Sequence, residues 1–416
     1  MHHFDYKDGE LFCEQVSVRQ IAEQVGTPFY LYSKATLTHH FEVFDKAFAE
    51  VPHITAFAVK ACSNLAVLSL LGAQGAGADI VSGGELFRAL KAGIDPGKMV
   101  FAGVGKTERE IAEALDADIL MFQVESEPEL ALLNKVAKGR KTTARIAIRV
   151  NPDVDPKTHP YISTGLKESK FGFPMAGVLR VFREANSMSH LQVVGVHQHI
   201  GSQITQIPPF VQSLERVAEL IDALREDGIQ VDYLDIGGGV GIPYDDSLPP
   251  TPAELGAAIL PTLKRLNVTV ITEPGRGIAG NAGIFVTRVL RLKNTPDRNF
   301  VVVDGAMNDL MRPSLYDAYH AIQPVVKRSG IPIKADVVGP VCESGDFFAK
   351  GRNIETPRVD DLLAIMSAGA YGFTMASTYN SRPRVAEVMA DGDTFHVVRQ
   401  RESYEDLIRS ETIPWT

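Results

Sequence analysis

ITAFAVKACSN, residues 54–64, is the first of a series of short apolar runs, and it ends in Lys60 before the chain turns polar. An apolar run bounded by polar residues is typical of a buried strand. Burial of an ammonium group is costly, so a lysine at the end of such a strand either reaches solvent or serves a reaction. A solvated surface residue is the more common case for a lone lysine.

The size of the chain predicts two domains. It has 416 residues, 45% hydrophobic and 22% charged, which exceeds the usual size of a single core. No apolar run is long enough to span a bilayer. The net charge of −9 disfavours nucleic acid and anionic membranes as partners.

The chain is expected to be cytoplasmic. Its start, MHHFDYKDGELFCEQ, lacks the basic and then apolar order of a secretory signal. The three cysteines, Cys13, Cys62 and Cys342, are widely spaced and show no disulfide or zinc pattern. A cysteine that matters is therefore expected to act as a thiol.

Between about Thr55 and Gly283, β-branched runs alternate with amphipathic stretches such as 83–93 and 210–228. This alternation indicates βα units around a parallel sheet. A doubly wound sheet would show fewer strands and a Gly-rich turn directly after the first one, which residues 56–64 lack. Eight predicted strands favour a (β/α)8 barrel of the TIM type. They cover residues 56–61, 78–82, 99–103, 118–124, 144–150, 191–200, 233–239 and 268–275.

After about Gly283 the strands follow one another without regular helices between them. This texture predicts a C-terminal antiparallel β domain, a sandwich or barrel. The short run PFYLYS (28–33) is expected to join it. We therefore expect a barrel domain at 34–280 and a β domain made of 1–33 and 281–416. The predicted strands of the β domain lie in 284–293, 299–305, 334–340, 361–372 and 382–399.

Five predicted barrel strands end in reactive or anion-binding groups, and in a parallel barrel these ends share one working face. Singly, each has an ordinary interpretation: a surface lysine, a tight turn, a core histidine or a structural ion pair. Together, glycines that expose N–H groups, a serine and an arginine form a phosphate cup, and a cup that faces a lysine indicates pyridoxal phosphate. The groups are Lys60, Asp79, His197 with His199 and Ser202, Gly237–Gly239, and Glu273–Gly277.

The motifs FAVKA, HIGSQ, DIGGG, EPGRG and CESGD resemble the fold-type III pyridoxal phosphate-dependent decarboxylases, whose barrel is alanine racemase-like. The resemblance implies that Lys60 holds the cofactor as a Schiff base and that His199 stacks on its ring. It also implies that Glu273 pairs with the ring nitrogen. A carboxylate there keeps the nitrogen protonated, which favours decarboxylation. Alanine racemases are expected to place an arginine at that position.

The same resemblance implies further contacts to cofactor and substrate. The phosphate would meet Ser202, Gly239, Gly275 and Arg276, with Gly237 and Gly238 shaping the turn and with Asp79 and Arg149 in support. Arg312 and Tyr316, with Arg276, would bind a distal carboxylate of the substrate, and Glu343 its distal ammonium. Cys342 would protonate the carbanion after CO2 leaves, and Tyr371 would touch both cofactor and substrate. The CESGD loop would enter the neighbouring subunit's site in a homodimer.

Within the family, the motifs are most similar to those of the members that decarboxylate meso-2,6-diaminopimelate to L-lysine, the last step of lysine biosynthesis. Ornithine or arginine as substrate would leave Arg312 and Tyr316 poorly used, because neither has a distal carboxylate. Carboxynorspermidine keeps a carboxylate and is the nearer alternative.

Two other classes of protein fit the sequence less well. A non-catalytic pyridoxal phosphate carrier would not need Cys342, Glu343 or a large second domain. A metal-dependent barrel aldolase lacks support, because the acidic residues and histidines are expected to form no compact ligand set. The sequence therefore predicts no metal.

Overall fold

The computed structural model describes residues 2–155, 170–245 and 247–415, which form two compact units. The first comprises residues 40–242 and 248–278, and the second comprises 1–39, 243–247 and 279–416. Among the described helices, none has both the length and the apolar character needed to cross a membrane.

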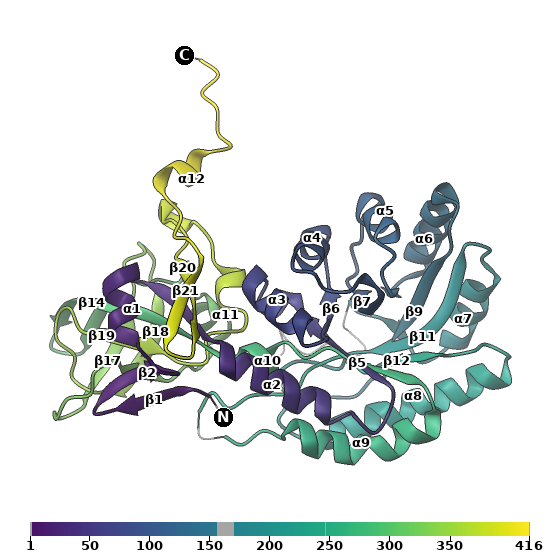
Figure 1. Cartoon of the computed structure of the whole chain (residues 1–416), viewed down its shortest axis with the longest axis horizontal. Coiled ribbons are helices and arrows are strands. Elements are labelled where there is room, and N and C mark those ends of the chain that lie inside the picture. Colours follow the sequence, from purple (N-terminus) through teal and green to yellow (C-terminus); the bar gives the residue numbers. More distant parts are fainter. Residues whose placement is uncertain (1, 156–169, 246, 416) are drawn as a thin grey trace. The chain divides into compact units, whose positions relative to one another are not determined.

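The first unit is a closed barrel of eight parallel strands (Figure 1). Each strand pairs with the next one along the barrel, and the last pairs with the first, at Ile271 and Ile54. The eight predicted strands and the barrel are therefore confirmed. The strands are β5 (His53–Ala58), β6 (Gly77–Ile80), β7 (Met99–Phe101), β8 (Met121–Val124), β9 (Ala144–Asn151), β11 (Leu191–Gln198), β12 (Tyr233–Asp235) and β13 (Thr269–Thr272). A two-residue strand, β10 (Phe173–Pro174), pairs with the end of β9.

Helices surround the barrel strands (Figure 1). Helix α8 buries Leu214, Val217, Ile221 and Leu224, and this spacing of three and four residues places them on one face. Capping boxes start two of the helices, with Thr107 in one and Thr251 in the other. The helices are α3 (Leu65–Ala73), α4 (Gly83–Lys91), α5 (Glu108–Asp116), α6 (Glu127–Arg140), α7 (Val178–Ser187), α8 (Pro208–Glu226) and α9 (Pro252–Leu266).

The second unit is built on a mixed nine-stranded sheet in which β4 lies between β14 and β20. Its core contains Phe29, Leu31, Ile284, Val286 and Val388. The strands are β4 (Phe29–Ser33), β14 (Gly283–Asn294), β15 (Asn299–Val303), β16 (Ile322–Pro324), β17 (Ile333–Val338), β18 (Phe347–Ile354), β19 (Leu362–Ile365), β20 (Ala386–Asp391) and β21 (Thr394–Arg399). A small sheet of β1 (Phe4–Lys7), β2 (Glu10–Cys13) and β3 (Val16–Ser17) belongs to the same unit.

The sheet differs from the antiparallel one predicted, because two of its strand pairs are parallel. These are β4 with β20 and β15 with β17. Neither pair is joined by a tight hairpin, so no turn forces an antiparallel arrangement. Strand β18 was not predicted, because Lys350, Gly351 and Arg352 interrupt its apolar pattern. The remaining helices are α1 (Val18–Val25), α2 (Lys34–Lys46), α10 (Arg276–Ala279), α11 (Arg312–Tyr316) and α12 (Tyr404–Ile408).

Candidate active site

Lys60 and Asp79 form an ion pair at the carboxyl-terminal rim of the barrel. Lys60 lies in a short 3-10 segment (Val59–Ala61) directly after β5, and its Nζ donates to Asp79 Oδ2 at 2.5 Å. The Asp79 side chain is fully buried, whereas that of Lys60 is 38% exposed. Within the described residues, Asp79 Oδ1 has no hydrogen-bond partner. A buried carboxylate thus holds an accessible amine at the rim.

The glycine turn after β12 is packed against neighbouring backbone. A Cβ on Gly238 would lie 2.2 Å from the Glu273 carbonyl oxygen, and one on Gly239 would lie 2.4 Å from that of Gly201. Gly237 and Gly239 have φ of 69° and 111°, which L side chains rarely adopt. Only glycine fits these three positions without a backbone shift, so the turn is more than a generic loop.

Ser202 and Arg276 meet beside this turn. Arg276 is buried, and its Nη2 donates to Ser202 Oγ at 2.9 Å. Gly275, also buried, precedes Arg276 in the chain. A hydroxyl and a guanidinium in contact beside a glycine turn supply the donors that a phosphate group needs.

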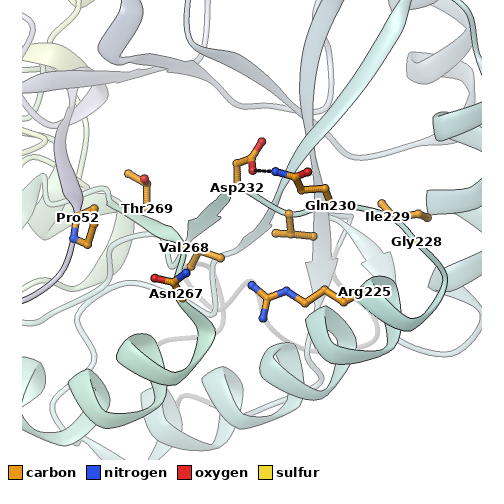
Figure 2. Close-up of a pocket in the computed structure, with 10 residues that line it drawn as sticks. Pro52, Arg225, Gly228, Ile229, Gln230, Asp232, Asn267, Val268 and Thr269 are labelled. Carbon is orange, nitrogen blue, oxygen red and sulfur yellow. Dashed lines mark hydrogen bonds between the residues drawn. The ribbon is translucent and has the colours of Figure 1, made fainter.

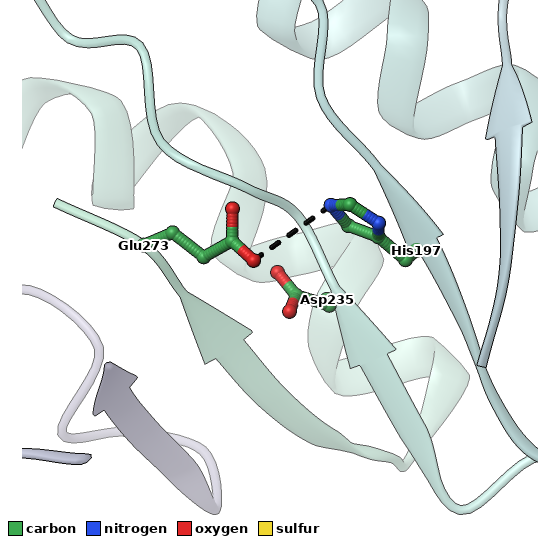
Figure 3. Close-up of side chains that lie close together, drawn as sticks. All are labelled: His197, Asp235 and Glu273. Carbon is green, nitrogen blue, oxygen red and sulfur yellow. Dashed lines mark ion pairs between the residues drawn. The ribbon is translucent and has the colours of Figure 1, made fainter. Parts of the chain in front are cut away.

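A buried group of acids and a histidine lies under the rim (Figure 3). The possible ligand atoms of His197, Asp235 and Glu273 all lie within 4.8 Å of one another. The expectation that acids and histidines form no compact set is therefore wrong, because neighbouring strand ends bring these three together. Gln123 Nε2 donates to Glu273 Oε1 at 2.8 Å and also to Asp235 Oδ2.

Burial controls the charge of this group. It raises the pKa of Glu273 to about 7, with the Asp79 carboxylate adding to the rise and Lys60 opposing it. Burial likewise lowers the pKa of His197 and of His199 well below the usual value, with Arg149 as the next cause. His199 accepts a hydrogen bond from the Gly238 N–H at 3.2 Å. Both imidazoles are therefore neutral at pH 7.

Arg149 lies inside a further buried ion pair. Its Nη1 is 3.2 Å from each carboxylate oxygen of Glu125, and its guanidinium lies 4.7 Å from the centroid of the Phe171 ring. A second buried ion pair joins Lys106 to Glu129, and Lys106 also donates to the Gln123 carbonyl. Arg149 thus has a structural partner that its sequence position did not reveal.

Apart from Arg276, which belongs to the barrel, the predicted substrate residues lie in the second unit. Arg312 is buried, and its Nη1 contacts the Tyr244 hydroxyl at 2.8 Å and His320 Nε2 at 3.1 Å. Tyr316 ends the same short helix and is half-buried. Tyr371 is half-buried and has a positive φ of 57°.

Cys342 and Glu343 lie on an exposed loop of the second unit. The Asn380 side-chain oxygen accepts from the Cys342 N–H at 3.1 Å, and the Tyr379 hydroxyl donates to Glu343 at 2.7 Å. At the base of the loop, Asp346 accepts from two backbone N–H groups, those of Met307 and Val341. The loop is therefore tied at its base and at its tip.

A pocket of about 610 Å³ lies at the opposite end of the barrel (Figure 2). Its lining residues precede or begin β5, β12 and β13, so it opens at the amino-terminal ends of the strands. In a (β/α)8 barrel this end serves stability and the carboxyl-terminal end serves catalysis. The lining is Pro52, Arg225, Gly228–Asp232 and Asn267–Thr269.

Comparison with known proteins gives the family. Residues 34–280 match the family described as "Pyridoxal-dependent decarboxylase, pyridoxal binding domain". The chain belongs to the pyridoxal-dependent decarboxylases. Its predicted class, a pyridoxal phosphate-dependent carboxy-lyase, is thereby confirmed.

Full-length relatives make the resemblance closer. A Vibrio cholerae protein named diaminopimelate decarboxylase is 51% identical over 99% of both chains. The solved structure of diaminopimelate decarboxylase from Helicobacter pylori with L-lysine has a TM-score of 0.92 and 43% identity, covering 94% of this chain and 98% of that one. The solved structure of "Diaminopimelate Decarboxylase from m. jannaschii" with L-lysine has a TM-score of 0.95 and 38% identity, covering 100% of this chain and 99% of that one. The resemblance predicted from the motifs is confirmed.

The rim residues fit a pyridoxal phosphate group. The glycine turn has no side chains to block a phosphate, and a Cβ at any of its positions would overlap a backbone oxygen. Ser202 and Arg276 offer hydrogen-bond donors to the phosphate. Asp79 Oδ1 and both ring nitrogens of His197 are buried and have no hydrogen-bond partner in the described ranges. Gln123 and Asp235 were not predicted from the motifs. Gln123 lies in a strand where it resembles a core position. Asp235 lies in DIGGG, a motif that was interpreted through its glycines.

The glycine turn gives a first prediction. Gly238→Ala is expected to weaken cofactor binding at least tenfold and to destabilise the fold by about 1–3 kcal/mol, because its Cβ would overlap a backbone oxygen. Cofactor titration and thermal unfolding measure the two effects. Gly139→Ala, in helix α6 with nothing within 4 Å of the added Cβ, is the matched control and should be neutral or slightly stabilising. Equal behaviour of both variants would contradict the packed turn.

Proposed function

We propose that this chain decarboxylates meso-2,6-diaminopimelate to L-lysine and CO2, using pyridoxal phosphate bound at the carboxyl-terminal rim of the barrel. The observation that carries the reaction type is the placement of Glu273 and Lys60 at the ends of adjacent strands, β13 and β5. The names of the full-length relatives support the substrate.

Within this proposal the barrel residues have distinct tasks. Lys60 holds the cofactor aldehyde, Glu273 keeps the ring nitrogen protonated, and Ser202, Gly239, Gly275 and Arg276 hold the phosphate. When bound, the cofactor supplies an electron-accepting ring for the electron pair that departing CO2 leaves. His199, neutral because its pKa is lowered by burial, packs on the ring face without adding a positive charge. Asp79 orients the Lys60 amine, and Arg149 supports the rim through its pair with Glu125.

Arg312 is proposed to read the distal carboxylate of the substrate, with Tyr316 and Arg276. A guanidinium fixed by Tyr244 and His320 presents its planar donors in one orientation, which suits a carboxylate. Glu343 is proposed to meet the distal ammonium, and Tyr371 to contact both cofactor and substrate. Cys342 is proposed to give its thiol proton to the carbon that loses CO2.

The proposal includes a homodimer whose two sites each take Cys342 and Glu343 from the partner subunit. The exposure of this tethered loop supports it: its tip presents a thiol and a carboxylate to solvent rather than to its own core. A cytoplasmic location is also proposed. No disulfide joins the three cysteines, as expected in a reducing compartment.

The test of the substrate is a panel assay of the purified protein with added pyridoxal phosphate. Lysine should form from meso-diaminopimelate, and little product should form from the L,L isomer, ornithine or arginine. Carboxynorspermidine keeps a carboxylate and is the informative competitor. Turnover of carboxynorspermidine with none of diaminopimelate would move the activity to that related decarboxylase.

Arg312→Ala sharpens this test. Loss of a charged hydrogen bond to the distal carboxylate should lower kcat/KM for meso-diaminopimelate about 10- to 100-fold. The weak activity on ornithine should stay the same, since ornithine has no such group. Arg298→Ala, which removes an arginine between β14 and β15 of the same unit together with its ion pair to Asp336, is the control. An equal loss on every substrate would assign Arg312 a structural task instead.

A further inference from the structure

Asp235 is a buried carboxyl group for which the proposed mechanism has no task. It ends β12 and is fully buried. Its Oδ1 accepts from the Gly237 N–H at 2.9 Å, and its Oδ2 accepts from Gln123 Nε2. The same amide nitrogen donates to Glu273 Oε1 at 2.8 Å. Gln123 therefore joins two carboxyl groups, which Figure 3 shows next to each other.

The surroundings do not allow both carboxyl groups to be charged. In the described part of the chain, neither forms an ion pair with a lysine or arginine. The ammonium of Lys60 contacts Asp79 instead. His197, 3.8 Å from Glu273, is neutral, because burial lowers its pKa. Two adjacent carboxylates in such a site retain at least one proton.

The contacts indicate which group keeps the proton. Burial, and then the Glu273 charge, raises the pKa of Asp235 well above its usual range. The Lys60 ammonium lowers the pKa of Glu273, and in the proposed function Glu273 also meets the protonated ring nitrogen, so Glu273 is the member of the pair with positive charge beside it. A proton kept by the pair is therefore better placed on Asp235, where the nearby charge is the negative one of Glu273.

We propose that Asp235 is a positioning residue that remains protonated and, with Gln123, holds Glu273 as an oriented carboxylate. The inference rests on the proposed function, in which Glu273 faces the ring nitrogen of the cofactor. Two hydrogen-bond donors to Glu273 lower the basicity of its carboxylate. The proton between Glu273 and the ring nitrogen therefore stays on the nitrogen. Asp235 and Gln123 would thereby decide where the ring proton lies.

Infrared spectroscopy of the holoenzyme near pH 9, about two pH units above the pKa of Glu273, detects a neutral carboxylic acid directly. The wild type is expected to show the C=O stretch of a protonated carboxyl group, which shifts when aspartate is labelled with 13C and is absent in Asp235→Asn. A spectrum in which the band is missing from the wild type, or survives in Asp235→Asn, would overturn the assignment of the proton.

The effect on the cofactor is read by 15N NMR of holoenzyme prepared with ring-labelled pyridoxal phosphate. In Asp235→Leu and Gln123→Leu the ring nitrogen signal should move toward the unprotonated position, and kcat should fall about 10- to 100-fold while KM changes little. Gln123→Leu covers the case in which Asp235→Leu does not fold. Thr272→Val is the matched control and should leave the signal in place, because it removes a buried hydroxyl, one residue before Glu273, that has no hydrogen-bond partner among the described residues.

The outcomes separate this inference from the proposed function. If both leucine variants keep the wild-type nitrogen signal and kcat, the positioning role is wrong even when diaminopimelate is the substrate. If the wild type turns over a different amino acid, the substrate proposal fails, while the infrared band and the nitrogen signal still test Asp235. A spectrum in which Asp235 and Glu273 are both ionised would instead favour a bound cation among His197, Asp235 and Glu273.

Discussion

Lys60→Ala is expected to reduce decarboxylation to less than about one-thousandth of the wild-type rate, because the variant has no amine to hold the cofactor aldehyde. The absorbance band of the covalently held cofactor should also disappear. Borohydride treatment should add the mass of the cofactor to the wild type and not to the variant. Retention of the band with normal turnover would show that another amine carries the cofactor.

The same substitution has a second, structural consequence. It leaves the buried Asp79 carboxylate without its cation, which should cost about 1–3 kcal/mol, below the range for a fully buried pair because Lys60 is 38% exposed. Lys60→Arg separates the two effects, since it keeps a cation for Asp79 and cannot hold the aldehyde. We expect it to be nearly as stable as the wild type and as inactive as Lys60→Ala. An active Lys60→Arg would contradict the role of Lys60 in holding the aldehyde, and a Lys60→Arg no more stable than Lys60→Ala would contradict the role of the ion pair.

The barrel could be predicted because its information is local. Each apolar run is short and β-branched, and each is followed by an amphipathic stretch, so strand number and direction follow from the pattern. Parallel strands place their carboxyl ends on one rim, and this rule alone brings Lys60, Asp79 and Glu273 to the same end of the barrel.

The partners of these residues were harder to predict because they depend on side chains far apart in the chain. Gln123 contacts Asp235 and Glu273 across 112 and 150 residues, and nothing in the strand MFQV marks its glutamine as different from a core position. The parallel strand pairs of the second unit have the same origin. Strand β4 pairs with β20, more than 350 residues later, where no local turn indicates the direction.

Function could be predicted further than side-chain geometry because a few motifs carry it. Glycines at 237–239 have φ values or contacts that no other residue tolerates, so their presence in the sequence already implies the turn. Arg312 shows the limit: its residue type suits a carboxylate, but neither of the two groups that fix its guanidinium, Tyr244 and His320, was predicted from the sequence.

Co-expression of Lys60→Ala and Cys342→Ala chains should restore activity that neither variant has alone. In the proposed homodimer each site takes Lys60 from one subunit and Cys342 from the other. A mixed dimer therefore contains one site with both substitutions and one site with neither. Random pairing makes half of the dimers mixed, so about a quarter of the wild-type activity should return. Two affinity tags allow the mixed dimers to be purified, and their activity should then be about half that of the wild type.

The control for this experiment pairs two substitutions in the same barrel. Lys60 and Glu273 belong to the same barrel rim, so each site takes both residues from one chain. In a dimer of a Lys60→Ala chain with a Glu273→Ala chain, every site therefore carries one of the two substitutions, and no activity should return. The loop contacts make Cys342→Ala a mild change to structure, because the residue is exposed and only its backbone N–H bonds to Asn380. Recovery in the first mixture and not in the second requires a shared site, because only then can the intact Cys342 of one chain serve the intact Lys60 of the other. Purified mixed dimers without activity would instead mean that each chain builds its site alone.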